Sequence, residues 1–400
     1  MKSEKQGNGK KYRVINIIIL VIALLLIVGY LGISILGGEK LKAARSIRKI
    51  NDTLYTMEYE GDYGLDAYLL QGGGASSEEM ADYLTEFLSN GLYKPEKDGI
   101  QGTPGCSTVS GNTADNTYLF GRNYDWQSGV TMVMHTKPRN GYESVSTTAL
   151  EFLGFGEDWR PEGLANQMMA LAGIYIPMDG INEKGLVIAD LMAGDREETH
   201  QATEKADITT TVGIRLVLDR AATVDEAIEL LQNYDMNSDI GTAHHYAVSD
   251  LSGRSVVIEY IDGETVVTET PVVTNHYLSE GHKNGIGSEQ SKERFRILSE
   301  AANKNDGHFD KDLVRDSLRT VSQGVMGDEY EVTRWSSVYD LEQPSVDYYF
   351  GEDYSSAYSA ALGGEDIFAG NVQFMFPNFK NHVYFYNALC NNSLNKVLDI

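Results

Sequence analysis

One residue in this sequence has a setting that favours covalent chemistry, Cys106. It follows Gly105 directly, where a stretch rich in Gly and Pro ends and a short β-type run begins. If the chain is cut between these two residues, Cys106 carries a thiol and a free α-amine together. The thiolate is the nucleophilic form of cysteine, and an α-amine with a pKa of about 7.7–8.0 can take the thiol proton near neutral pH. This pair predicts an enzyme that attacks amide bonds.

A second cluster, Gly121-Arg122-Asn123-Tyr124-Asp125-Trp126, ends the next predicted strand. Cys106–Ser110 and Thr117–Arg122 flank a turn-forming stretch, which predicts a β-hairpin. A hairpin returns the end of its second strand to the start of the first. Arg122 would then lower the pKa of the thiol, and Asp125 would hold the amine. Taken alone, the cluster is more typical of a strand end with a surface Arg–Asp pair.

Further segments follow in an order that resembles a known family. They are Asp179–Leu186, Asp250–Glu259, Val273-Thr274-Asn275, Ser291–Phe295 and Thr333–Tyr339. With the two segments above, they resemble the choloylglycine hydrolase and penicillin V acylase family, and the related acyl-coenzyme A:6-aminopenicillanate acyltransferases, over roughly residues 106–350. These proteins are linear-amide hydrolases of the N-terminal-nucleophile type.

The resemblance implies roles for five residues. Cys106 resembles the nucleophile that is exposed when the preceding chain is removed. Arg122 and Asp125 resemble the residues beside its thiol and its amine. Asn275 resembles the side-chain amide that binds the oxyanion, and Arg294 resembles the arginine that completes the polar network. Without the family, Asn275 would be typical of a turn at a strand end, and Arg294 of a solvated helix face.

Two features depart from the family pattern. Bile-salt hydrolases have Asn and penicillin V acylases have Tyr near the position where this chain has Met192. That difference weakens both substrate assignments and leaves one oxyanion contact to a backbone group. Ordinary members remove little more than a methionine, whereas residues 1–105 precede the cysteine here. The acyltransferase branch is similar in cutting a Gly–Cys bond by itself, which fits Gly105-Cys106 better.

The first part of the chain predicts a membrane anchor and a removable segment. Val14 to Leu36 is nearly continuous Ile, Leu and Val, long enough to cross a hydrocarbon core of about 30 Å. Residues 1–13 form a basic tail, which favours a single-pass protein with its bulk outside the cell, although basic residues after the span weaken that orientation. Residues 37–105, with a helix expected over 76–91, would be a separate pro-segment and linker. A cleaved signal peptide is the alternative to a retained anchor.

The remainder, residues 106–400, is expected to be one domain of short strands, tight turns and a few helices. Besides the hairpin, strands are predicted at 174–177, 186–189, 246–248, 255–260, 265–268, 272–274, 334–339, 346–350 and 383–386, and helices are predicted from a Thr223/Glu226 capping box and over 289–302. Blocks of antiparallel strands indicate the α+β class. The family resemblance implies a four-layer αββα sandwich.

Composition excludes several function classes. A net charge of −25 at pH 7 argues against binding to nucleic-acid phosphates. With two cysteines, Cys106 and Cys390, the chain has neither a disulfide-rich scaffold nor a multi-cysteine zinc site. A bridge between these two stays open and would consume the nucleophile. His244-His245 does not predict a metal site, because adjacent strand residues face opposite sides.

The expected function is therefore hydrolysis of a linear amide bond in a small N-acyl compound, without a metal or an organic cofactor. One alternative keeps the fold and passes the acyl group to an amine instead of water. The other is an uncut, non-catalytic binding module held at the membrane. Bile salts, penicillins, N-acyl amino acids and acyl-homoserine lactones all present such an amide, so the substrate stays open. The oligomeric state, including a homo-oligomer, stays open as well.

Overall fold

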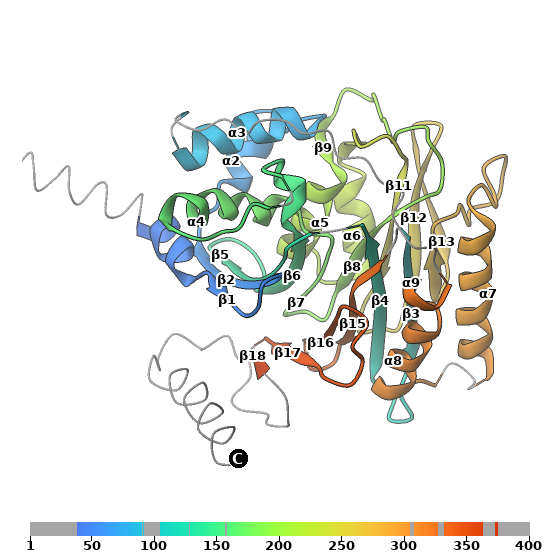
Figure 1. Ribbon diagram of the computed structural model, residues 1–400. Helices are drawn as coiled ribbons and strands as arrows, with labels where there is room; N and C mark the ends of the chain where they lie inside the picture. The colour runs from blue at the N-terminus through green and yellow to red at the C-terminus, as the bar shows by residue number, and fades with distance from the viewer. Residues whose placement is uncertain are drawn as a thin grey trace, which may run out of the picture.

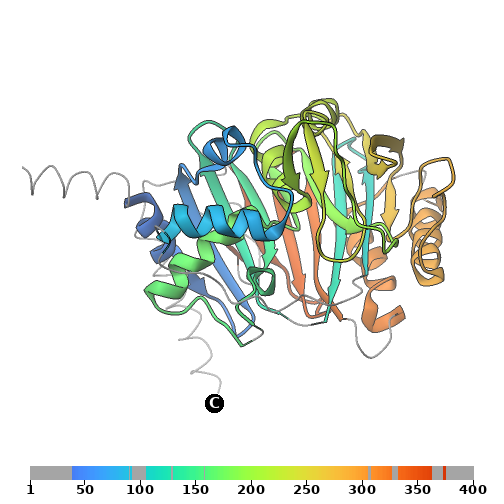
Figure 2. The same ribbon diagram turned by 90° about the horizontal axis from the view of Figure 1, so that it is seen from above.

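Two β-sheets lie face to face, and helices cover their outer faces (Figures 1 and 2). This computed structural model describes residues 38–89, 91, 105–127, 129–156, 158–304, 308–326, 332–362 and 373–374. Within these residues the layers run helix, sheet, sheet, helix. The expected α+β class and αββα arrangement are confirmed for this part of the chain.

Within the described residues, one sheet has nine strands and the other has seven. The nine-stranded sheet runs β1 (Arg48–Lys49), β2 (Leu54–Gly61), β5 (Thr131–Pro138), β6 (Ser144–Ala149), β7 (Asp179–Asn182), β8 (Val187–Met192), β11 (His244–Ser249), β12 (Ser255–Ile261) and β13 (Glu264–Glu269). The seven-stranded sheet runs β14 (Val272–Thr274), β3 (Cys106–Asn112), β4 (Tyr118–Trp126), β15 (Val332–Asp340), β16 (Ser345–Phe350), β17 (Tyr358–Ala361) and β18 (Gln373–Phe374). A separate parallel pair joins β9 (Ala206–Thr209) and β10 (Tyr234–Asn237).

Apolar side chains from both sheets fill the space between them. Val133, Val187 and Val257 come from the nine-stranded sheet, and Phe120 and Trp335 come from the seven-stranded sheet, all buried in one cluster. Because side chains alternate along a strand, the remaining apolar residues face the helices. Each sheet is thus covered on both faces.

The helices divide between the two outer layers. The nine-stranded sheet packs with α2 (Leu65–Leu70), α3 (Ser77–Ser89), α4 (Leu164–Ala170), α5 (Thr210–Arg220), α6 (Val224–Leu231) and two 3-10 turns, η1 (Leu150–Leu153) and η2 (Leu171–Tyr175). The seven-stranded sheet packs with α7 (Glu289–Lys304), α8 (Lys311–Thr320) and α9 (Gln323–Met326). The predicted cap of α6 is confirmed, since the Thr223 hydroxyl accepts the Glu226 N–H at 3.2 Å. Glu226 itself accepts the N–H of Ala222.

The predicted hairpin that carries Cys106 is confirmed. Strands β3 and β4 pair antiparallel, with Cys106 opposite Tyr124 and Thr108 opposite Arg122. Residues that face each other in such a pair point to the same side of the sheet. Cys106 and Arg122 therefore both face the space between the sheets, whereas Asp125 faces the helical layer.

Residues 37–105 were expected to be separate from the domain, but the described residues 38–89 pack into it, and their role as a pro-segment stays a prediction. Strand β2 lies inside the nine-stranded sheet and pairs in parallel with β5 over its whole length, from Leu54 to Gly61. Met57 and Tyr59 in this strand are buried in the core, as are Met80 and Leu84 in α3. The segment before Cys106 thus contributes strands β1 and β2 and helices α2 and α3 to the folded unit.

Three other predictions of secondary structure need correction. Ile174–Pro177 is not a strand, because residues 171–175 form η2. Asp179–Asn182, which lies between two predicted strands and was not itself predicted as one, is strand β7, and the turn begins at Glu183. The four successive strands predicted between residues 246 and 274 do not stay together, since β11, β12 and β13 lie in one sheet while β14 joins β3 in the other.

Some predictions lie outside the described residues. They are the span Val14–Leu36, the strand at 383–386 and the partner cysteine Cys390. Among the residues described, none of the helices combines the length and the apolar character that a membrane crossing requires. The anchor and the Cys106–Cys390 bridge stay predictions.

If the chain is cut before Cys106, we expect the N-terminal piece to stay bound under native conditions. Full burial of one large apolar side chain is worth about 1.5–3 kcal/mol, and β2 alone buries several. Both pieces should elute together in size-exclusion chromatography and separate in denaturant. Met57→Ala should weaken the association by roughly 2–5 kcal/mol, whereas Leu70→Ala, at an 88% exposed position, should not. Loss of the N-terminal piece in native buffer would contradict this expectation.

Candidate active site

The peptide group that joins Gly105 to Cys106 is held at both ends. The backbone N–H of Asp125 donates to the Gly105 carbonyl oxygen at 2.9 Å. The Cys106 N–H donates to Oδ1 of Asn275 at 2.5 Å. The first bond extends the β3–β4 hairpin by one residue, and the second comes from the end of β14, the other neighbour of β3. The fold thus fixes this peptide between two strands.

Arg294 connects the residues on one side of this peptide. It reaches from α7 and is 1% exposed, so the alternative of a solvated helix face is wrong. Its guanidinium donates to Asn275 Oδ1 at 2.9 Å, to Asp125 Oδ2 at 3.1 Å and to the Cys106 carbonyl oxygen at 3.1 Å. One planar cation therefore sets the relative positions of three predicted site residues.

Asp125 is fully buried and is an acceptor for several neighbours. Besides Arg294, the Thr333 hydroxyl donates to Oδ1 at 2.6 Å and the Gln323 amide donates to Oδ2 at 3.2 Å. Burial raises the pKa of Asp125 to about 6, although the Arg294 guanidinium and these hydrogen bonds oppose the shift. The sequence predicts that this carboxylate bonds the Cys106 nitrogen, but in the intact chain that nitrogen donates to Asn275 instead. Asp125 holds Arg294 through its carboxylate and the Gly105 carbonyl through its backbone N–H.

The Cys106 thiol lies on the other face of the hairpin, beside Arg122. The side chain is 3% exposed, and the nearest guanidinium nitrogen is 3.8 Å from the sulfur. Burial raises the pKa of the thiol to about 11, and Arg122 offsets only part of that shift. The thiol is thus mostly protonated at neutral pH in the intact chain, so any attack by it would need a base.

Arg122 is anchored in the opposite sheet by groups that the sequence did not single out. Its guanidinium donates to Asp179 Oδ2 at 2.8 Å, to the Asp190 carbonyl oxygen at 2.6 Å and to the Met178 carbonyl oxygen. Asp179 also accepts from the Trp335 indole at 2.9 Å and from the Tyr339 hydroxyl at 2.8 Å. Asp179 belongs to a segment that carries the family resemblance, but nothing local shows that it pairs with Arg122.

Asn275 makes different bonds from those expected of an oxyanion ligand. Its Oδ1 takes the Cys106 N–H, and its Nδ2 donates to the Met192 carbonyl oxygen at 2.8 Å. A carbonyl oxygen can only accept hydrogen bonds, so the Met192 carbonyl cannot stabilise an oxyanion. An amide nitrogen carries two hydrogens, and the second one leaves Asn275 able to donate to a substrate.

Gly105 occupies a position that fits little more than a hydrogen atom. A Cβ built on it would lie 2.1 Å from the Gln323 amide nitrogen and 3.0 Å from Asp125 Oδ2. Gln323 begins the short helix α9 and also accepts from Gln290 at 3.0 Å. Gln323 is a site residue that sequence reasoning missed, because no local pattern connects α9 with the residue before Cys106.

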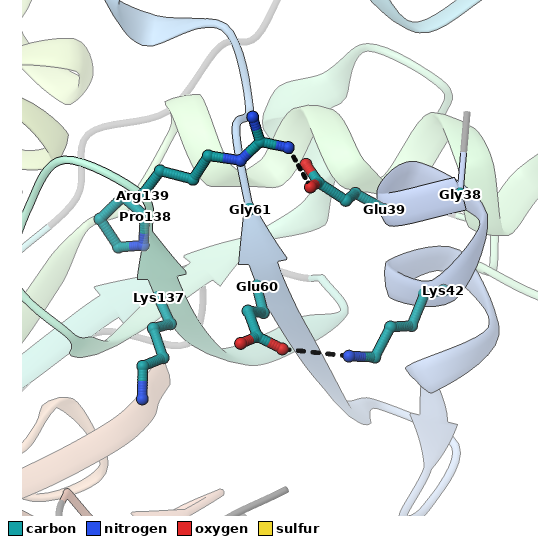
Figure 3. Close-up of a pocket in the computed structure, with 8 residues that line it drawn as sticks. All are labelled: Gly38, Glu39, Lys42, Glu60, Gly61, Lys137, Pro138 and Arg139. Atoms are coloured by element: carbon teal, nitrogen blue, oxygen red, sulfur yellow. Dashed lines mark hydrogen bonds and ion pairs between the residues drawn. The ribbon is translucent and has the colours of Figure 1, made fainter. Parts of the chain in front are cut away.

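A surface pocket lies away from this site, between residues 38–46 and the ends of β2 and β5 (Figure 3). Ion pairs of Arg139 with Glu39 and of Lys42 with Glu60 line it. None of the residues that line this pocket belongs to the predicted site. Its position gives it no part in chemistry at Cys106.

The structure places His244 and His245 as predicted, on opposite faces of β11. His244 bonds Asp190 at 2.8 Å, and His245 bonds Glu259 at 3.1 Å. Within the described ranges, His, Cys, Asp and Glu side chains form no group of three or more suited to a metal ion. Each histidine is instead one half of a buried pair with a carboxylate.

The raised pKa of Asp125 predicts a pH dependence of stability in the uncut chain. Between the ordinary carboxyl pKa of 3.8 and the folded value of about 6, the folded state binds more protons than the unfolded state. The free energy of unfolding should therefore fall as pH rises through this window, by up to about 3 kcal/mol from this group. Chemical denaturation of Cys106→Ala protein between pH 4 and 7 measures it. In Cys106→Ala protein that also carries Asp125→Asn, the free energy of unfolding should fall less steeply with pH. Equal slopes in the two proteins would contradict the raised pKa of Asp125.

Comparison with known proteins gives matches at three levels. The family described as acyl-coenzyme A:6-aminopenicillanic acid acyl-transferase matches residues 112–354, more than half of the chain. A penicillin V acylase from Pectobacterium atrosepticum is 35% identical over 106 residues, which are 24% of this chain and 28% of that relative. The chain thus matches little more than a quarter of that relative's length.

Two solved structures are similar at lower identity. A penicillin V acylase from Agrobacterium tumefaciens aligns with a TM-score of 0.46 and 19% identity, over 64% of this chain and 86% of its own. A conjugated bile acid hydrolase from Clostridium perfringens aligns with a TM-score of 0.47 and 18% identity, over 70% of this chain and 99% of its own. The match over residues 112–354 is the one that decides the family: this chain belongs to the acyl-coenzyme A:6-aminopenicillanic acid acyl-transferase family.

Proposed function

We propose that this protein is a cysteine hydrolase of linear amide bonds, activated by its own cleavage between Gly105 and Cys106. The substrate would be a small N-acyl compound, as the names of the penicillin and bile-acid relatives indicate. Cys106 is the nucleophile, Asn275 accepts the hydrogen bond of its nitrogen, Arg294 donates to its carbonyl oxygen, and Arg122 lies beside its sulfur. No step of this chemistry calls for a metal or an organic cofactor.

The observation that carries the proposal is the position of the Gly105–Cys106 peptide. Its carbonyl oxygen already accepts an N–H from Asp125 at 2.9 Å, which is the contact that a developing oxyanion needs. Its nitrogen donates to Asn275 Oδ1. The thiol is carried by the same residue as this nitrogen, Cys106, and is therefore close to the carbonyl carbon. A buried peptide bond held in this way next to a cysteine is prepared for attack by that cysteine.

The cleavage step balances without an added reagent except water. The Cys106 sulfur attacks the Gly105 carbonyl carbon, a C–S bond forms, and the C–N bond breaks. The electron pair of that bond stays on nitrogen, which also takes the thiol proton and becomes the α-amine. Water then hydrolyses the thioester, releases the Gly105 carboxylate and restores the thiol. Because the pKa of the thiol is about 11 in the uncut chain, this single event can be slow.

After the cut, the same nitrogen acts as a base. As an amine, it can still donate to Asn275 Oδ1 while its lone pair faces the thiol. It takes the thiol proton as the sulfur attacks the substrate carbonyl, and it gives the proton to the leaving amine. The second N–H of Asn275 can stabilise the oxyanion. Water finally hydrolyses the acyl-enzyme and releases the acid.

Acyl transfer is the second candidate, and the family assignment favours it. The two functions share every step up to the acyl-enzyme, and differ in whether water or an amine takes the acyl group. Incubating the cut protein with penicillin V, with and without an added amine acceptor, distinguishes them by product analysis. A non-catalytic module held at the membrane would give neither product, and its chain would stay intact across Gly105–Cys106.

The surroundings of the enzyme are part of the same proposal. We infer a single-pass anchor at 14–36 with the catalytic domain outside the cell, which rests on the apolar run and the basic tail before it. The inclusion of β2 in the sheet supports an N-terminal piece that stays attached after the cut. Under this proposal, the mature enzyme works at the membrane surface. Whether the mature enzyme forms a homo-oligomer is a separate question.

Replacing Gly105 by Ala should slow self-cleavage by at least about tenfold. The added Cβ would meet Gln323 and Asp125, and small displacements of reacting groups are costly to rates. Gly38→Ala is a matched control, because nothing lies within 4 Å of a Cβ built there. Gel electrophoresis of freshly synthesised chain over time measures both variants. Cleavage at the normal rate in Gly105→Ala would contradict the tight fit.

N-terminal sequencing of the mature protein should begin at Cys106. Cys106→Ser should slow or abolish both self-cleavage and turnover, because a hydroxyl is less nucleophilic than a thiol near neutral pH. Cys390→Ser should leave both intact, which also tests the bridge between the two cysteines. Unchanged turnover in Cys106→Ser, or an active chain still intact across Gly105–Cys106, would rule out this mechanism.

A further inference from the structure

The turn that follows β14 and contains Asn275 is held by contacts with several other segments of the chain. Asn275 follows β14, and its backbone carbonyl is enclosed by two glycines from other segments. A Cβ on Gly194 would lie 2.4 Å from that carbonyl oxygen, and a Cβ on Gly287 would lie 2.5 Å from it. Both glycines have positive φ values, +83° and +151°, where an added side chain is also strained. The backbone of Asn275 therefore has little room to shift.

A carboxylate from the opposite sheet holds the other end of the same turn. Glu259 lies on β12 and is fully buried. Its Oε1 accepts the Leu278 N–H at 2.9 Å, and its Oε2 accepts the Ser279 N–H at 2.7 Å. Two successive backbone N–H groups on one carboxylate define where residues 278 and 279 lie. Glu259 thus links β12 of the nine-stranded sheet to the turn that follows β14 of the seven-stranded sheet.

Glu259 keeps its negative charge in this buried place. Burial opposes ionisation, but His245 at 3.1 Å and the two backbone N–H groups outweigh it and lower the pKa of Glu259 to about 2. Hydrogen bonds to a charged acceptor are stronger than those between neutral groups. A neutral amide in its place would accept through one oxygen and would bring a donor toward groups that themselves donate.

We propose that Glu259 is a positioning residue, which fixes the turn at 275–279 and so aims the Asn275 amide at the Cys106 nitrogen. This inference rests on the proposed function, in which the Asn275 amide holds the nitrogen of the nucleophile Cys106. Glu259 touches neither Cys106 nor Gly105. Its effect passes through the backbone between Ser279 and Asn275, and the two glycines keep that stretch from relaxing elsewhere.

The test uses self-cleavage of the full chain, so it needs no knowledge of the substrate. Wild type, Glu259→Gln, Asn275→Ala and the double variant are synthesised, and the first-order rate of cutting at Gly105–Cys106 is followed by electrophoresis and mass spectrometry. Glu264→Gln, an exposed carboxylate on the adjacent strand β13, is the matched control. Each change is also made in the uncut Cys106→Ala chain, where the melting temperature reports stability alone.

We expect Glu259→Gln to slow cutting by roughly 10- to 100-fold, the effect of a small misplacement at a reacting group, and Glu264→Gln to cut like wild type. In the Asn275→Ala background, Glu259→Gln should slow cutting little further, although it still lowers the melting temperature. Such coupling is what a route through Asn275 requires, and a purely structural role would not produce it.

Two results would overturn the inference. One is an unchanged rate in Glu259→Gln, and the other is a double variant in which the two losses multiply. If Glu259→Gln does not fold in the Cys106→Ala background, Glu259→Asp replaces it, since that side chain keeps the charge but is one methylene shorter. The same rate criteria then apply. A wild-type chain that never cuts would instead refute the proposed function, so the two failures are distinguishable.

Discussion

The peptide group between Gly105 and Cys106 is immobilised in the folded chain, as the proposed self-cleavage would require. Here the immobilisation comes from strand pairing. The Gly105 carbonyl is bonded to β4 and the Cys106 N–H to the residue directly after β14, so the sheet that builds the core also holds this peptide group. Every other feature of the site, from the thiol environment to the buried arginines, depends on the peptide being kept there.

Buried charges connect the layers around this peptide. Arg122 crosses from the seven-stranded sheet to Asp179 in the nine-stranded sheet, and Arg294 crosses from α7 to Asp125. Ion pairs in an apolar interior are weak evidence for stability, because removing charges from water is costly. Their value here is positional, since a guanidinium with several fixed acceptors has one orientation. Charge therefore sets the geometry, and apolar packing supplies most of the folding energy.

Local patterns predicted a large part of the site. The turn between β3 and β4 is visible in the sequence, and a hairpin brings Cys106, Arg122 and Asp125 together by strand geometry alone. The family segments added Asn275 and Arg294. Asp179 and Gln323 were not assigned, because their partners lie in other layers and no spacing rule joins them. Likewise, nothing in the sequence of β2 signals that it pairs with β5, which comes about 70 residues later in the chain.

The place of β2 in the sheet has a consequence for how the protein can be produced. Without the preceding segment, β5 would become a border strand with a row of unpaired backbone groups on a hydrophobic sheet. Such borders recruit other chains and lead to aggregation. We therefore expect a shortened gene that starts at Cys106 to yield insoluble material, even though it encodes all five residues that we propose for the chemistry. The segment before Cys106 is thus first of all a part of the sheet, and the proposed cut at Gly105–Cys106 would act on a chain that this segment has already helped to fold.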